Sequence, residues 1–321
     1  MPDGETAPTQ ASQPVGSTSP YASGDPVTNR QPLDFTDPRD NVYAFAKMWG
    51  SFAPEPHIAT FHGTMFASIG TNRLLPVFGF AGTGVTKVKM LDNGHVLMRG
   101  KETGFFTDLE TGVPMETWDN PFTGETVEVY EFFNDTIGAE LTLELPKLYV
   151  GDNPDAAVHM NFRPGNVEPE TIPHILPWEV YGDEVLLEWD YTHSYSNPVT
   201  PTLWPKASTG TWINPSEHFT IYTSLAELED RDLPSAHFRA GFSRLSPWWP
   251  WMRMGGSGVE GVLFGRMFSR TTHRGIDDVP RPILDRIMER DPSYLELPDD
   301  WNAGQVLSTW EAYARDVPPE V

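Results

Sequence analysis

The sequence contains no cysteine among its 321 residues. This absence excludes disulfides, thiolate metal sites and cysteine nucleophiles, and it fits a reducing compartment. Basic residues are also scarce, with 22 Lys and Arg against 45 Asp and Glu and a formal net charge of −23. Nucleic acids and anionic membranes attract clustered Lys and Arg, and no such cluster occurs here. We therefore expect neither a nucleic acid nor a membrane as partner.

Long apolar runs and familiar catalytic motifs are missing too. No run approaches the roughly 18 residues of a membrane helix, and the first residues lack the charged and apolar parts of a secretion signal. The motifs G-x-G-x-x-G, Walker A and G-x-S-x-G do not occur, so nucleotide-fold redox, P-loop and α/β-hydrolase chemistry have no support. His57 and His62 would point to opposite faces of a strand, which disfavours a shared metal. We expect no metal and no cofactor.

Composition divides the chain at one place. Residues 1–31 are rich in Pro, Ser, Thr and Gly and nearly free of large apolar residues, which is typical of a disordered arm. No linker interrupts the remainder, so we expect residues 32–321 to form a single β-rich domain with a helical C-terminal tail.

Helical spacing of apolar residues is confined to a few segments. Asp37 followed by Pro38 is a typical helix start, and Gly50 ends the helix expected at 38–49. The pattern starting at Ser224 resembles a capping box before a short helix. Two more helices are expected at 282–290 and 305–315.

Elsewhere the apolar residues alternate with a period of two, as in strands. Asn93-Gly94 between two such runs is a strong hairpin signal. About ten mostly sequential strands with short turns predict an antiparallel β-barrel or a strongly curved sheet with peripheral helices. The expected strands lie at 57–69, 75–90, 95–108, 126–133, 138–145, 156–163, 175–181, 184–195, 209–212, 218–222, 236–245 and 258–270.

The strand expected at 184–195 has one aromatic face that carries a histidine. Trp189, Tyr191, His193 and Tyr195 fall on this face. An apolar wall with one polar group suits a small-molecule pocket, with His193 and Tyr191 as an acid–base pair and Trp189 and Tyr195 as binding walls. The alternative is a core face whose polar tips find hydrogen-bond partners.

Three further candidates depend on which way their strands face. His62 becomes a second acid–base group if its face lines the lumen, and does nothing if it faces water. Arg99 shares a face with Lys101, and this face is either solvated or aimed at an anionic group, in which case Arg99 would hold a substrate carboxylate or phenolate. The last candidate is an apolar loop that either closes one end of the barrel or forms the lip of the pocket. Its residues are Trp248, Trp249, Trp251 and Met252.

Four stretches of the sequence form long, specific motifs: Asp37-Pro38-Arg39-Asp40-Asn41, Gly104 to Gly112, Trp118 to Glu125, and Phe242 to Gly255. Together they resemble the DUF1838 family. The resemblance runs from about Leu33 to the C-terminus. It implies membership of a family of unknown function and carries over no catalytic residues. Many members begin with a twin-arginine export signal, which we do not find here, so we expect a cytoplasmic protein with exported relatives.

These patterns lead to three hypotheses about function. The first is an enzyme that needs no cofactor, a lyase or isomerase acting on a small apolar or aromatic molecule in the β-barrel pocket. The second is a carrier that binds such a ligand without turnover. The third is a structural domain whose aromatic residues are all core. A homo-oligomer is left open.

Overall fold

The computed structural model describes residues 29–71, 73–146, 171–192, 194–297, 301 and 307–321. Most of the expected arm and the strand expected at 156–163 lie outside these residues. Residues 29–31 contact the body, because Arg30 bridges to Asp230 and pairs with Glu229. In the part of the chain that is described, no helix is long and apolar enough to span a membrane.

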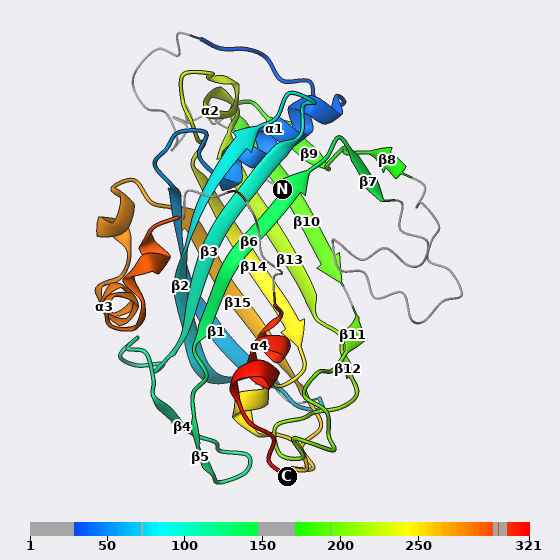
Figure 1. The fold of residues 1–321 in the computed structure, drawn as a ribbon, viewed down its shortest axis with the longest axis vertical. Helices are drawn as coiled ribbons and strands as arrows, with labels where there is room; N and C mark the ends of the chain where they lie inside the picture. Colours follow the sequence, from blue (N-terminus) through cyan, green and yellow to red (C-terminus); the bar gives the residue numbers. More distant parts are fainter. Residues whose placement is uncertain (1–28, 72, 147–170, 193, 298–300, 302–306) are drawn as a thin grey trace, which may run out of the picture.

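One large antiparallel sheet of nine strands dominates the molecule, in the order β6-β3-β2-β1-β15-β14-β13-β10-β9. The predicted antiparallel sheet is thus confirmed, and it is strongly curved (Figure 1). It does not close into a barrel, because the two edge strands, β6 and β9, are not paired with each other in the described sheet. Its strands are β1 (His57–Ser68), β2 (Leu75–Met90), β3 (Val96–Thr107), β6 (Phe132–Leu141), β9 (Trp178–Tyr181), β10 (Glu184–Thr192), β13 (Ser216–Ser224), β14 (Phe238–Ser246) and β15 (Val262–Thr271).

Three short two-stranded sheets flank the large one. They are β4 (Thr117–Asp119) with β5 (Thr126–Glu128), β7 (Glu144–Pro146) with β8 (Thr171–Pro173), and β11 (Tyr195–Ser196) with β12 (Trp212–Ile213). The expected central strand therefore ends at Thr192, and Tyr195 belongs to another sheet. The turn Asn93-Gly94 does join β2 to β3, and Gly94 adopts a φ of +86° that favours glycine there.

Helix α1 (Pro38–Trp49) lies against the inner, concave face of the sheet and closes one end of it (Figure 1). Asp37 caps it by accepting a hydrogen bond from the Arg39 amide at 2.9 Å. Its apolar side chains, such as Phe45 and Met48, pack on inner-face residues of β10, β13 and β14. The sequence predicted a peripheral helix. The helix is instead part of the core, because its apolar face fills part of the concavity.

The other end of the inner face is closed by a second core. Helix α4 (Thr309–Asp316) and the 3-10 turn η1 (Pro250–Met252) pack there on Met65, Phe78 and Leu263. Helix α3 (Arg281–Arg290) and the 3-10 turn η3 (Pro292–Leu295) cover the outer face of β1 to β3 instead. The remaining short elements are α2 (Leu225–Glu229), which starts at the capping residue Ser224, and η2 (Gly275–Asp278).

The pairing register shows which side chains share the inner face, because directly opposite residues in a sheet point the same way. One row runs through Trp189, Phe219, Phe242, Met267 and Phe80. The inner-face residues at the two closed ends are buried, whereas several between them remain partly accessible to solvent. We call this accessible middle the inner patch. Its residues are Phe61, Phe80, Glu102, Trp189, Tyr191, Glu217, Phe219, Phe242 and Arg244.

Candidate active site

Glycines give the inner patch a floor of flat aromatic rings. Gly82 and Gly104 lie directly opposite each other on β2 and β3. A Cβ at Gly82 would lie 2.5 Å from the Phe61 ring, and one at Gly104 would lie 2.3 Å from the Phe80 ring. Because these positions carry no side chain, both rings can lie down on the neighbouring strands. The rings of Phe61 and Phe80 are 5.5 Å apart between centroids.

A second aromatic group continues the patch on β14, β13 and β10. The ring centroids of Phe242 and Phe219 are 4.5 Å apart, and those of Phe219 and Trp189 are 5.3 Å apart. Helix α1 borders this group, since Trp49 meets Phe219 edge to face at 6.4 Å. Phe45 meets Trp189 in the same way at 5.6 Å. Such rings offer an apolar surface for a flat ligand.

Glu102 lies within this aromatic surface, on the inner face of β3. It keeps some solvent-accessible surface, yet desolvation by the surrounding protein raises the pKa of its carboxyl to about 7. Glu217 raises this pKa further and Arg244 lowers it. A carboxyl whose pKa lies near 7 can accept or donate a proton at neutral pH, which is the property of a general acid–base group.

Arg244 and Glu217 lie directly opposite each other on β14 and β13 and form an ion pair at 3.1 Å. Three strands, β2, β1 and β15, separate the strand of Arg244 from β3 in the sheet, and the strand of Glu217 is one further away. Their electrostatic effect on Glu102 therefore acts across the concavity, which only the curvature of the sheet makes possible. Tyr191 lies opposite Glu217 on β10, and desolvation followed by the charge of Glu217 raises the pKa of its phenol.

Three buried donors at the patch lack a hydrogen-bond acceptor within the described residues. They are Nε of Arg244 and the indole N–H groups of Trp49 and Trp249. Trp249 reaches the patch from the opposite end to Trp49, with its ring 5.9 Å from that of Phe80. Buried polar groups in folded proteins are almost always satisfied, so these donors call for an acceptor from water or from a ligand.

The structure separates the residues predicted from the sequence. Trp189 and Tyr191 lie on the inner face and belong to the patch, as their alternation predicted. His193 lies outside the described residues. Tyr195 is buried in β11, where its ring packs in the core around the Trp loop. Of the aromatic face predicted at 184–195, the described part that forms the site is therefore Trp189 and Tyr191.

His62 and Arg99 both lie on the outer face of the sheet. His62 is exposed and pairs in register with Phe268, away from the concavity. Arg99 is buried, on the opposite face of β3 from Glu102. Its neighbour on that face, Lys101, donates a hydrogen bond to the Ser293 carbonyl beside α3 at 3.1 Å. The roles predicted for His62 and Arg99 depended on their strands turning these side chains toward the concavity. Both side chains lie on the outer face instead, and the same alternation places Glu102 on the inner face.

The apolar loop closes one end of the sheet. Its four large residues, Trp248, Trp249, Trp251 and Met252, are at most 4% exposed and pack in one core. Their burial fits the alternative in which the loop closes one end of the sheet. Trp249 alone also contacts Phe80 of the inner patch, so a substrate-binding role for the whole loop is not what this arrangement provides.

Sequence reasoning missed Glu102, Glu217 and Arg244. The signal for Glu102 was the spacing Gly100, Glu102, Gly104, in which a carboxylate stands between two glycines on one face of a strand. Glycine inside a strand often marks a close approach by a ligand or another chain segment. Glu217 and Arg244 carry no comparable local signal, since only the register of β13 and β14 pairs them.

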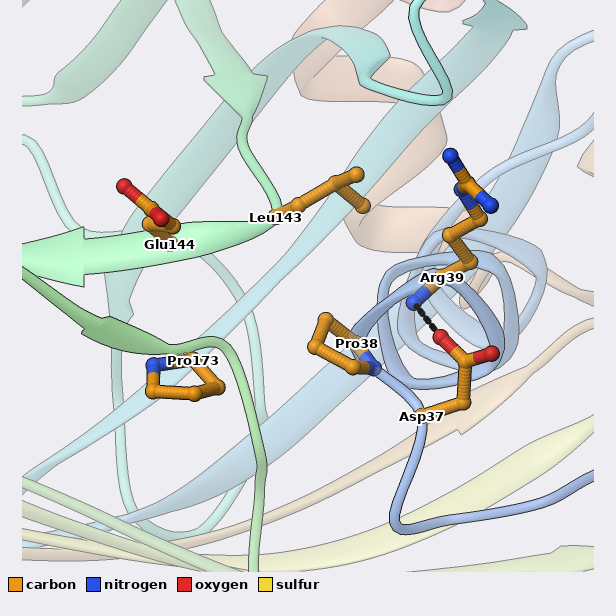
Figure 2. A pocket seen from close by; sticks show the side chains of 6 residues that line it. All are labelled: Asp37, Pro38, Arg39, Leu143, Glu144 and Pro173. Atoms are coloured by element: carbon orange, nitrogen blue, oxygen red, sulfur yellow. Dashed lines mark hydrogen bonds between the residues drawn. The ribbon is translucent and has the colours of Figure 1, made fainter.

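A separate hollow of about 260 Å³ lies beside the start of α1. Figure 2 shows Arg39 and Glu144 on opposite sides of it, with Leu143 and Pro38 between them. The Asp37 carboxylate here is already engaged with the Arg39 amide, so the hollow offers no converging reactive groups. Among the described residues no cluster of three or more His, Asp or Glu could hold a metal ion.

The sequence was compared with models of known protein families. The profile of DUF1838, described as a protein of unknown function, matches residues 55–317, which is most of the chain. The chain belongs to the DUF1838 family. The matched region contains β1 to β15 and α4, and therefore every residue of the inner patch. None of the curated proteins compared with the chain matches it.

Proposed function

We propose that this DUF1838 protein is an enzyme that binds a small aromatic molecule on the inner patch and moves a proton with Glu102, as a lyase or isomerase that needs no cofactor. The observation that carries the proposal is the carboxyl of Glu102, with a pKa of about 7, set among aromatic rings. A surface carboxylate would stay ionised at neutral pH and would be a weak base. A carboxyl with a pKa near 7 is a stronger base, and a large fraction of it is still ionised at neutral pH.

The neighbouring groups fit removal of a proton from a carbon next to a carbonyl. Ionised Glu102 would take the proton, and the electron pair of the C–H bond would move onto the carbonyl oxygen as an enolate. Arg244, whose Nε has no acceptor in the described part of the chain, would donate to that oxygen. Returning the proton to another carbon gives an isomerisation, and loss of a group from the adjacent carbon gives an elimination.

The aromatic rings define the substrate by size and polarity. Flat rings such as Phe61, Phe80 and Phe242 favour an aromatic or otherwise planar apolar body. The donors of Trp49 and Trp249 add positions for acceptor oxygens. An aromatic ketone or an aromatic compound with a conjugated carbonyl meets both requirements.

Hydrogen–deuterium exchange tests this proposal without knowledge of the product. A panel of aromatic ketones is incubated with the protein in D2O, and NMR follows replacement of the C–H protons next to the carbonyl. We expect protein-dependent exchange whose rate rises with pH through about 7, because the carboxylate form of Glu102 is the base. Glu102→Gln should abolish exchange and leave binding, and exchange that persists in this variant refutes the role of Glu102.

Two controls separate catalysis from binding and from folding. Glu188→Gln removes an exposed carboxylate from the outer face of β10 and should leave exchange unchanged. Trp189→Ala should chiefly weaken binding. The carrier hypothesis also predicts saturable binding that Trp189→Ala weakens, but it predicts no exchange above background in the unaltered protein.

A further inference from the structure

The outer face of the sheet carries a groove of about 500 Å³ that the inner site does not use. It lies over β1, β13, β14 and β15, beyond the part of the outer face that α3 covers. Its volume is in the range of sites for small molecules. The groove is lined by His62, Thr220, Tyr222, Arg239, Gly241, Phe268 and Arg270, and by Ala240 and Ser269.

Gly241 lines the middle of this groove on β14, between lining residues of β13 and β15. Its φ is not positive, and a Cβ built on it would meet no atom within 4 Å. Neither backbone strain nor crowding therefore requires glycine here, although glycine in a strand is less stable than alanine by roughly 0.5–1 kcal/mol. The missing side chain leaves a dent between Thr220 and Phe268, its neighbours on the adjacent strands.

Two like charges stand side by side at one end of the dent. Arg239 and Arg270 are directly opposite each other on β14 and β15, an arrangement that is destabilising by itself. Arg239 is paired with Glu184 at 3.1 Å, and its guanidinium lies 5.3 Å from the centre of the Tyr222 ring. No ion pair of Arg270 is found among the residues that the structure describes. An anion at this position would offset the repulsion between the two guanidinium groups.

An exposed aromatic ring lies directly beside Gly241, on the same strand as Arg270. Phe268 is 54% exposed in the middle of the sheet, with the His62 ring 6.3 Å away. We propose that the groove binds a small planar aromatic anion. Its ring would rest on Gly241 between Phe268 and Tyr222, and its anionic group would lie on Arg270 and Arg239. This site is independent of Glu102, which faces the other side of the sheet.

Isothermal titration calorimetry with 2-naphthoate tests the site, and 2-naphthalenemethanol and inorganic phosphate serve as probes of the ring alone and the anion alone. We expect 2-naphthoate to bind more tightly than either. Arg270→Glu should weaken it by at least about tenfold, the effect of losing a hydrogen bond to a charged group. Gly241→Val should also abolish binding, because it fills the dent while suiting a strand.

The matched control is Arg266→Glu. Arg266 lies on the same strand and the same face, is exposed, and does not line the groove. It should leave the affinity within about twofold once ionic strength screens long-range charge. Equal loss in Arg266→Glu and Arg270→Glu, or full binding in Gly241→Val, overturns the proposal. Loss of binding in Trp189→Ala would place the ligand on the inner face instead, and this also overturns it.

Discussion

Replacing Glu102 by Gln should stabilise the protein relative to the unaltered chain, and this gain should be larger at high pH than at low pH. Desolvation raises the pKa of this carboxyl from 4.5 to about 7 in the folded state. Between these values the folded protein holds a proton that the unfolded chain has lost. Stability therefore falls as pH rises through this window, and the full loss is present above pH 7.

The size of the effect follows from the two pKa values. One pKa unit corresponds to about 1.36 kcal/mol, so the stability that Glu102 removes should increase by about 2.5 kcal/mol between pH 5 and pH 8. Glutamine has nearly the same shape and cannot ionise, so Glu102→Gln removes this pH dependence. Any loss of packing or hydrogen bonding in the variant is the same at both pH values and cancels.

Urea denaturation at pH 5, 6, 7 and 8 measures the free energy of unfolding of both proteins. The difference between variant and unaltered protein should grow with pH, and most of the growth should lie below pH 7. Glu188→Gln serves as the reference for loss of one negative charge. A pKa shift of half a unit would already change the difference in unfolding free energy by about 0.7 kcal/mol. A difference that stays constant within about 0.5 kcal/mol from about pH 5 to pH 8 therefore refutes a raised pKa at Glu102.

The neighbours of Glu102 should shift its pKa in opposite directions. Arg244 lowers this pKa and Glu217 raises it. Arg244→Gln should therefore raise the pKa of Glu102, and Glu217→Gln should lower it. Carbon-13 NMR of labelled glutamate carboxyls reads both shifts directly, and the Glu102 resonance is assigned by its absence in Glu102→Gln. Shifts of the same sign would show that these charges do not face Glu102 across the sheet.

Two predictions concern the elements that hold the site. Asn41→Ala should destabilise the protein by about 3 kcal/mol in urea denaturation, since Asn41 is fully buried and accepts the Trp178 indole N–H at 2.9 Å among its four hydrogen bonds. A loss below about 1 kcal/mol would contradict this. Gly82→Val should destabilise by at least about 3 kcal/mol, because its Cβ would lie 1.9 Å from the Thr103 carbonyl oxygen. Gly241→Val should be tolerated, because a Cβ at Gly241 meets no atom within 4 Å.

Local sequence patterns predicted the longest strands and α1, because these depend on neighbouring residues. The strands expected at 126–133 and 138–145 are divided differently in the structure, among β5, β6 and β7. The period of two fixed β2 at Leu75–Met90, and the Asp-Pro start fixed α1 at Pro38–Trp49. Alternation also put Trp189 and Tyr191 together on one face. What alternation cannot decide is which face of a strand points inward. At β3 the face with Arg99 drew attention as a site, and the inner face is the one with Glu102.

The pairing of β1 with β15 is the step that no local pattern contains. It joins Ala59 to Thr271, which are far apart in the sequence, and places β14 and β13 on the same curved sheet as β3. The electrostatic effect of Arg244 and Glu217 on the pKa of Glu102 depends on that pairing. The inward position of α1 likewise depends on the concavity, so the sequence predicted the helix and not its location.

The distribution of charge gives the inner patch its chemical character. The chain carries a formal charge of −23, yet the inner patch holds only two carboxyl groups, Glu102 and Glu217, and one guanidinium, Arg244. Because Glu217 and Arg244 offset each other, the protonation of Glu102 decides whether this surface is neutral or carries one negative charge. A ligand that becomes anionic as Glu102 takes up its proton would leave the net charge of the site unchanged. Proton transfer would then move charge toward Arg244 without importing any, and this favours neutral substrates over anionic ones at the inner patch.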